Sequence, residues 1–111
     1  MTKLTIEDIK PSLEKEGDYT ISLSNISLFN MSVRSPEWHI FGLLFNNPNT
    51  GLWTARFLKE DLTVVSEESK KEFSSARQIL VKEIADYISR GYEITALSSG
   101  YDIWPWLQRR K

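Results

Sequence analysis

The sequence predicts an α+β fold, a two-layer sandwich in which an antiparallel sheet of about five or six strands packs on one long helix, with a short N-terminal helix added. Three observations lead to this prediction. Much of residues 18–65 alternates apolar and polar side chains, as strands do. The connections between these segments are short, which favours an antiparallel meander. Residues 67–90 then carry one apolar stripe at helical spacing, which needs a sheet face for its burial.

The N-terminal helix is expected over residues 5–16. Thr5 is a suitable N-cap, and Asp8 follows three residues later, as in a capping box. Pro11 lacks a backbone donor, so we expect the helix either to kink there or to restart with Pro11 in its first position. Gly17 is a suitable stop.

Six strands are expected from the period-two alternation and its interruptions. They cover about residues 18–24, 28–34, 38–46, 52–58, 62–65 and 92–97. The phase of the alternation slips after Asn25, and we interpret the slip as a turn rather than a bulge. Residues 38–46 are apolar on both parities, which is typical of a central strand that is covered on both faces. The clearest turn is Asn47–Gly51.

The long helix is expected over residues 67–90. Ser66 and Ser69 are both possible N-caps, and Ser69 with Glu72 matches a capping box. Gly91 follows the last apolar position and predicts the glycine that ends the helix. The inward stripe consists of Phe73, Ala76, Leu80, Ile84 and Tyr87.

Composition limits the classes of function. The 111 residues fit a single domain, and 14 basic against 15 acidic residues give a formal charge of −1. This balance excludes a histone-like clamp on nucleic acid, and the absence of cysteine excludes disulfides, thiolate metal sites and cysteine nucleophiles. The longest apolar run, Ile40–Phe45, is too short to cross a bilayer, and the first residues do not resemble a signal peptide. We therefore expect a cytoplasmic protein.

Catalytic parts are scarce in the sequence. His39 is the only histidine, and it lies in the most apolar strand, where a packed ring is a more common role than a general base. The adjacent carboxylates Glu60–Asp61 and Glu67–Glu68 diverge on a strand or a helix, so they do not readily share a metal ion. No nucleotide-binding or zinc-protease motif occurs. We expect no enzyme, no metal and no cofactor, although a site built from His39 and carboxylates by the fold stays open.

Four tryptophans stand out. Trp38 and Trp53 flank the Asn47–Gly51 turn and could be cross-strand neighbours near it. Trp104 and Trp106 lie in an aromatic and basic tail, residues 101–111. One interpretation is that these two rings fold back and cap the core. The other is that part of the aromatic set is an exposed anchor, because tryptophan and arginine are enriched at interface hot spots.

These features predict a small, non-enzymatic protein-binding module, such as an inhibitor, an immunity-type factor or an adaptor for a larger bacterial or phage protein. The candidate partner-binding residues are Trp53, Trp104, Trp106, Arg109, Arg110 and Lys111. The alternative is a nucleic-acid-binding module that uses an aromatic sheet face and the basic tail. A homodimer is a further expectation if strand 28–34, 62–65 or 92–97 is an uncovered edge.

Overall fold

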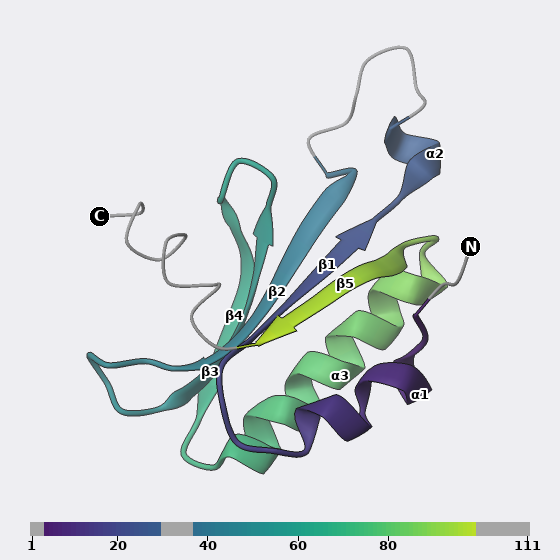
Figure 1. Cartoon of the computed structure of the whole chain (residues 1–111). Coiled ribbons are helices and arrows are strands. Elements are labelled where there is room, and N and C mark those ends of the chain that lie inside the picture. The colour runs from purple at the N-terminus through teal and green to yellow at the C-terminus, as the bar shows by residue number, and fades with distance from the viewer. Residues whose placement is uncertain (1–3, 30–36, 100–111) are drawn as a thin grey trace.

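The structure, a computed structural model, describes residues 4–29 and 37–99 and confirms the predicted α+β class. A five-stranded antiparallel sheet has the order β4-β3-β2-β1-β5, and α1 and α3 lie on one of its faces (Figure 1). The helices are α1 (Ile6–Ile9), a 3₁₀ turn (Pro11–Leu13), α2 (Ile26–Phe29) and α3 (Phe73–Ser89). The strands are β1 (Tyr19–Ser24), β2 (His39–Asn46), β3 (Trp53–Lys59), β4 (Val64–Lys70) and β5 (Glu93–Ser99).

The N-terminal helix is shorter than predicted. The capping box is present: Thr5 Oγ1 accepts from the Asp8 backbone N–H at 3.2 Å, and Asp8 Oδ2 accepts from that of Thr5 at 2.9 Å. The α-helix then ends at Ile9, and a 3₁₀ turn restarts at Pro11, which confirms the expected break. Helical structure stops after Leu13 rather than at Gly17, because the single 3₁₀ turn does not continue as an α-helix.

The segment after β1 corrects the first two residues of the strand predicted over 28–34. Residues 28 and 29 belong to α2, and residues 30–36 lie outside the described part of the chain. The Asn25 side chain starts the helical turn, since its Oδ1 accepts from the Ser27 backbone N–H at 3.1 Å and from the Ser27 hydroxyl at 2.6 Å. The slip in the alternation therefore marks a turn, as interpreted, but the turn opens into a helix.

The sheet combines a meander with one crossover. Strands β1 to β4 follow one another as antiparallel neighbours, and α3 then returns the chain so that β5 pairs with β1. This places β2 in the middle of the sheet, as its two-sided apolar sequence predicts. The turn before β3 uses Gly51 at φ +73°, and its N–H donates to the Asn47 carbonyl at 2.7 Å.

The long helix begins later than predicted. Glu67–Lys70, expected in the helix, belong to β4, and the strand expected over 62–65 runs from Val64 to Lys70. Pairing with β3 favours a strand over a helix in this region. The Ser69 hydroxyl bonds the Thr54 hydroxyl at 2.9 Å, and Glu67 bonds Arg56 at 2.6 Å. The N-cap is Glu72, without a side-chain cap bond, instead of Ser66 or Ser69. Gly91, at φ +103°, follows the C-cap as predicted.

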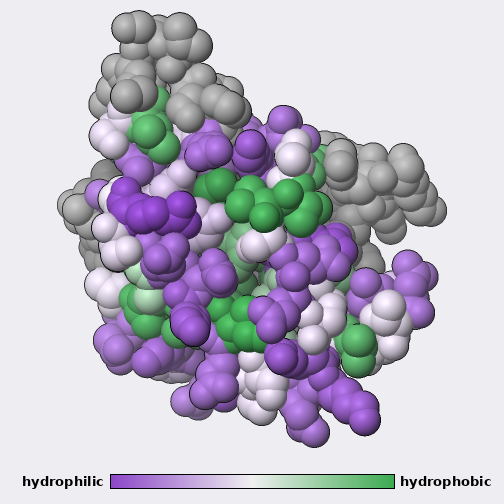
Figure 2. Space-filling view, turned by 180° about the vertical axis from the view of Figure 1, so that it is seen from behind, coloured by the Kyte–Doolittle hydropathy of each residue, from purple (hydrophilic) through white to green (hydrophobic). Residues whose placement is uncertain are grey.

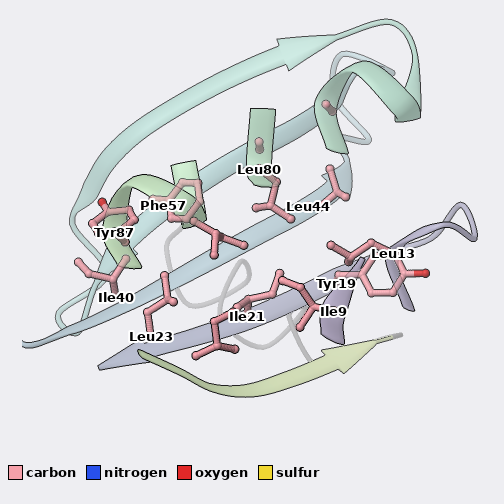
Figure 3. Packing of buried hydrophobic residues seen from close by; sticks show 14 of the residues in the cluster. Ile9, Leu13, Tyr19, Ile21, Leu23, Ile40, Leu44, Phe57, Leu80 and Tyr87 are labelled. Atoms are coloured by element: carbon pink, nitrogen blue, oxygen red, sulfur yellow. The ribbon is translucent and has the colours of Figure 1, made fainter. Parts of the chain in front are cut away.

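The main core lies between α3 and the sheet. All five predicted stripe residues of α3 are buried against it. Figure 3 shows Leu80 and Tyr87 pointing toward Leu44, Ile40 and Phe57 of the sheet. Ile9 and Leu13 close the core beside β1. Burial of such side chains contributes about 1.5–3 kcal/mol each, so this layer supplies most of the driving force for folding.

Candidate protein-binding surface

The outer side of β4 is an open sheet edge. β4 pairs with β3, and no strand within residues 4–29 and 37–99 pairs with its other side (Figure 1). An edge strand presents unpaired N–H and C=O groups in a row, which another polypeptide strand can complete. The strand that contains residues 64 and 65, one of the three named as possible edges, therefore lies at an edge of the sheet.

The hairpin bonds between β3 and β4 fix which backbone groups point outward. The Lys59 N–H donates to the Thr63 carbonyl, and the Lys59 carbonyl accepts from the Leu62 N–H, both at 2.9 Å. Because the direction of the backbone N–H and C=O groups alternates along a strand, the odd-numbered residues of β3 direct these groups toward β4. Their register partners Ser66, Glu68 and Lys70 direct their own backbone groups toward β3. Glu67 and Ser69 therefore direct their backbone groups toward the open side.

Side chains on β4 combine two exposed valines with paired charges. Val64 and Val65 are each 45% exposed, which is high for apolar residues of this size. Glu67 Oε1 lies 2.6 Å from Arg56 Nε, and Glu68 Oε2 lies 3.5 Å from Lys70 Nζ. The hydropathy view from behind shows separate hydrophobic patches between hydrophilic residues (Figure 2). Contact through this edge would thus rest on backbone bonds, with the valines adding apolar area.

The opposite edge, β5, is partly occupied. Leu4 forms an antiparallel bridge with Ile94, so the N-terminal segment covers part of the outer side of β5. Leu4, Ile88 and Tyr92 are among the residues that line a hollow of about 430 Å³ there. β5, another of the strands named as possible edges, also lies at an edge, but the bridge from Leu4 leaves it fewer open backbone groups than β4.

Trp53 is the one predicted partner-binding residue that lies within the described ranges. Its ring packs edge-to-face on Phe73 of α3, with ring centroids 4.9 Å apart, and it is half-buried against the main core. The structure does not bring it to the open edge as an isolated anchor. Trp104, Trp106, Arg109, Arg110 and Lys111 lie outside the described residues.

Trp38 and Trp53 are not cross-strand neighbours, and that expectation is wrong. The register pairs Trp53 with Asn46, whereas Trp38 precedes the other end of β2 and donates its indole N–H to Glu60 Oε1 at 2.9 Å. The reason is the length of β2: Trp53 begins β3 next to the shared turn, whereas Trp38 precedes the far end of the eight-residue strand β2. The His39 ring lies 4.9 Å from that of Trp38 and 4.5 Å from that of Phe41. His39 thus belongs to an aromatic row.

A basic hollow lies between the N-terminal helical segment and α3. Its lining includes Lys10, Arg77 and Lys82 together with Glu14, and its volume is about 350 Å³. Arg77 Nη1 donates to the Leu13 carbonyl at 3.4 Å, which holds the guanidinium at this position. Three of its lining side chains are basic and one, Glu14, is acidic.

Within the described part of the chain, shifted pKa values belong to three tyrosines and one aspartate, and burial or local hydrogen bonds cause them. Burial raises the pKa of Tyr19, Tyr87 and Tyr92 above the usual tyrosine value, and Arg90 partly opposes this for the last two. Side-chain and backbone hydrogen bonds from Thr63 lower the pKa of the Asp61 carboxyl. The Tyr19 hydroxyl donates to the Lys15 carbonyl at 2.5 Å and that of Tyr92 to the Glu37 carbonyl at 2.6 Å, so both serve the fold.

Within residues 4–29 and 37–99, no group of three or more histidine or acidic side chains is placed to hold a metal ion. No helix in these same ranges is long and apolar enough to span a membrane. Comparison of the chain with family models, curated proteins and solved structures gives no match.

Proposed function

We propose that this protein is a small protein-binding module that takes up a strand of its partner at the outer edge of β4. The observation that carries the proposal is the open backbone row of β4, with two exposed valines at its start. Main-chain bonds supply affinity in such strand addition, and alternate side chains supply selectivity. The role is non-enzymatic and cytoplasmic, that of an inhibitor, immunity-type factor or adaptor in a bacterium or phage.

The charges on β4 favour a different protein over a second copy as the partner. A two-fold axis through the middle of the strand would place Glu67 of one copy against Glu67 of the other. Like charges directly opposite each other on paired strands are destabilising. A partner strand with apolar residues opposite the valines and with no acidic residue opposite Glu67 avoids this repulsion.

The proposal is tested with a proline at an outward-facing position. Glu67→Pro removes one outward N–H, and Glu67→Ala is the matched control because it also loses the ion pair to Arg56. A partner captured from the native host is re-expressed and titrated with each variant by calorimetry. We expect Glu67→Pro to weaken binding at least tenfold relative to Glu67→Ala.

Amide exchange supplies a readout at the edge itself. The Glu67 and Ser69 amides should exchange rapidly in the unbound protein and slow on addition of the partner, since strand addition would hydrogen-bond them. Equal affinities of the two Glu67 variants, with no protection of these amides, would show that the partner binds elsewhere.

We retain nucleic-acid binding as the second proposal because of the basic hollow lined by Lys10, Arg77 and Lys82. An aromatic stacking platform has less support, since Phe45 on the helix-free face of the sheet is 2% exposed. Titration of a single-stranded oligonucleotide at rising salt tests this proposal. Binding that falls steeply with salt and is lost in Lys10→Glu/Lys82→Glu would favour it over strand addition.

A further inference from the structure

A second apolar cluster lies on the sheet face that α1 and α3 do not cover. Leu43, Phe45 and Leu58 form it, and Phe41 and Leu62 pack against it. Their partners in the register show that they share one face, because Leu43 pairs with Arg56, and Phe41 pairs with Leu58. The helices pack on the opposite face, against residues such as Leu44 and Phe57.

The burial of this cluster requires a covering layer. Leu43 is 1% exposed, Phe45 2% and Leu58 3%. Side chains of a sheet stand roughly perpendicular to it, so neighbours on the same face shield their flanks but leave their tips open. The Arg56 guanidinium, 5.1 Å from the centre of the Phe45 ring, covers one tip in part. No helix of the described ranges lies over the rest of the face (Figure 1).

Two further residues indicate that this face is kept from water. The Thr20 hydroxyl, on β1 beside Leu43, is shielded from solvent and has no hydrogen-bond partner. Leu62 holds φ at +72°, where glycine is the usual residue, yet it places an apolar side chain against the cluster. A non-glycine residue at such a φ costs about 1–2 kcal/mol, which burial of the leucine side chain can offset.

The register locates the point where the chain leaves the sheet. Ser99, the last residue of β5, pairs with Tyr19 of β1, and Tyr19 pairs with Leu44 of β2. Two strand spacings of about 4.8 Å therefore separate this point from the part of β2 that carries Leu43 and Phe45. Residues 100–111 follow Ser99 and could span about 40 Å if extended, so the whole cluster is within their reach.

We propose that the helix-free face is the docking surface of the chain's own C-terminal segment, residues 100–111. Four large apolar side chains in this segment match the cluster in character: Ile103, Trp104, Trp106 and Leu107. Each tryptophan can bury about 150–250 Å². In this proposal the two indole rings stabilise the fold rather than bind a partner, and the proposal does not depend on the β4 edge.

The other uncharacterised segment, residues 30–36, is a weaker candidate. It precedes Glu37 and the start of β2, near Phe41 and Leu58, whereas Leu43 and Phe45 lie toward the far end of that strand. Its sequence, Asn-Met-Ser-Val-Arg-Ser-Pro, contains no aromatic residue, and polar residues flank its methionine and its valine. It therefore offers less apolar area than residues 100–111, and it lies farther from Leu43 and Phe45.

Substitution in the full chain tests the proposal. Trp104→Ala/Trp106→Ala should lower Tm by roughly 10 °C and should raise the fluorescence of an added hydrophobic dye, because the cluster becomes exposed. Arg109→Ala/Arg110→Ala is the matched control from the same segment and should change neither. If the two double variants have the Tm and dye response of the wild type, the segment does not cover this face.

A quenching experiment on the full chain gives a result that does not depend on the stability of the double variant. In Trp38→Phe/Trp53→Phe only Trp104 and Trp106 fluoresce, and we expect at least a fivefold lower iodide quenching constant in buffer than in urea. Equal constants would overturn the proposal. The mass in solution is measured on the same sample, and shielding that disappears on dilution of a dimer would identify a second copy as the cover, which also overturns it.

Discussion

At the scale of single residues, Gly42 shows how closely the central strand is packed. A Cβ atom on this residue would lie 2.8 Å from Cε2 of Phe57, whose ring is 1% exposed and cannot move aside. We predict that Gly42→Ala lowers the free energy of unfolding by about 2–3 kcal/mol, measured by urea denaturation. Gly17→Ala is the matched control, because its nearest neighbour lies at an ordinary 3.9 Å. Equal effects of the two variants would contradict this account.

The buried tyrosines predict a loss of stability at alkaline pH. Burial raises the pKa of Tyr19, Tyr87 and Tyr92 above the value of about 10 expected in the unfolded chain. Above pH 10 the unfolded state therefore binds fewer protons than the native state, and stability falls as pH rises through the folded pKa values. Below pH 10 the tyrosines are protonated in both states, and their contribution to the free energy of unfolding is fully present.

Urea unfolding between pH 8 and pH 11 measures this loss. Tyr92→Phe should be less stable at pH 8, since it lacks the bond to the Glu37 carbonyl, but should show a shallower decline above pH 10. Lysine deprotonation affects the wild type and the variant alike, so the difference between their slopes isolates the tyrosine. Parallel slopes would mean that Tyr92 does not contribute.

At the scale of elements, β4 tests the bonding phase derived for the open edge. The backbone N–H of Glu68 points toward β3 and that of Glu67 points away from it, so a proline removes a hydrogen bond of the sheet only at Glu68. We predict that Glu68→Pro costs about 2–3 kcal/mol more than Glu68→Ala, whereas Glu67→Pro stays within about 1 kcal/mol of Glu67→Ala. Thermal and urea denaturation of the four variants measures this. A larger cost of proline at Glu67 than at Glu68 would show that Glu67, not Glu68, bonds to β3.

β4 also shows what the sequence could not predict at this scale. Ser66–Lys70 has the residues of a helix start, and the Ser69 and Glu72 pattern matches a capping box. Its strand conformation comes from long-range partners on β3, above all the bonds of Arg56 to Glu67 and of Thr54 to Ser69. By contrast, the apolar residues of α3 and β2 follow helical and strand patterns over many residues, and the sequence predicted the correct type of secondary structure for both.

At the scale of the whole molecule, the predicted layers follow from the sequence, while the position of the open sheet edge does not. An apolar stripe on α3 and a strand apolar on both parities are enough to predict a sheet with a central strand and one covering helix. An open edge depends on strand order, and the order β4-β3-β2-β1-β5 requires the crossover that returns β5 beside β1. The sequence could therefore name candidate edge strands, but the strand order was needed to show which of them is open.

The assembly state follows from the same edge. The acidic pair Glu67–Glu68 lies in the middle of β4, so self-pairing of two copies through this strand would bring like charges together. We predict a monomer by light scattering at high protein concentration, and a mass that rises with concentration in Glu67→Gln/Glu68→Gln. The control Glu14→Gln/Glu16→Gln makes the same change of net charge at exposed positions away from β4, and it should remain monomeric. A wild type that dimerises, and keeps doing so in Glu67→Pro, would place self-association on another surface.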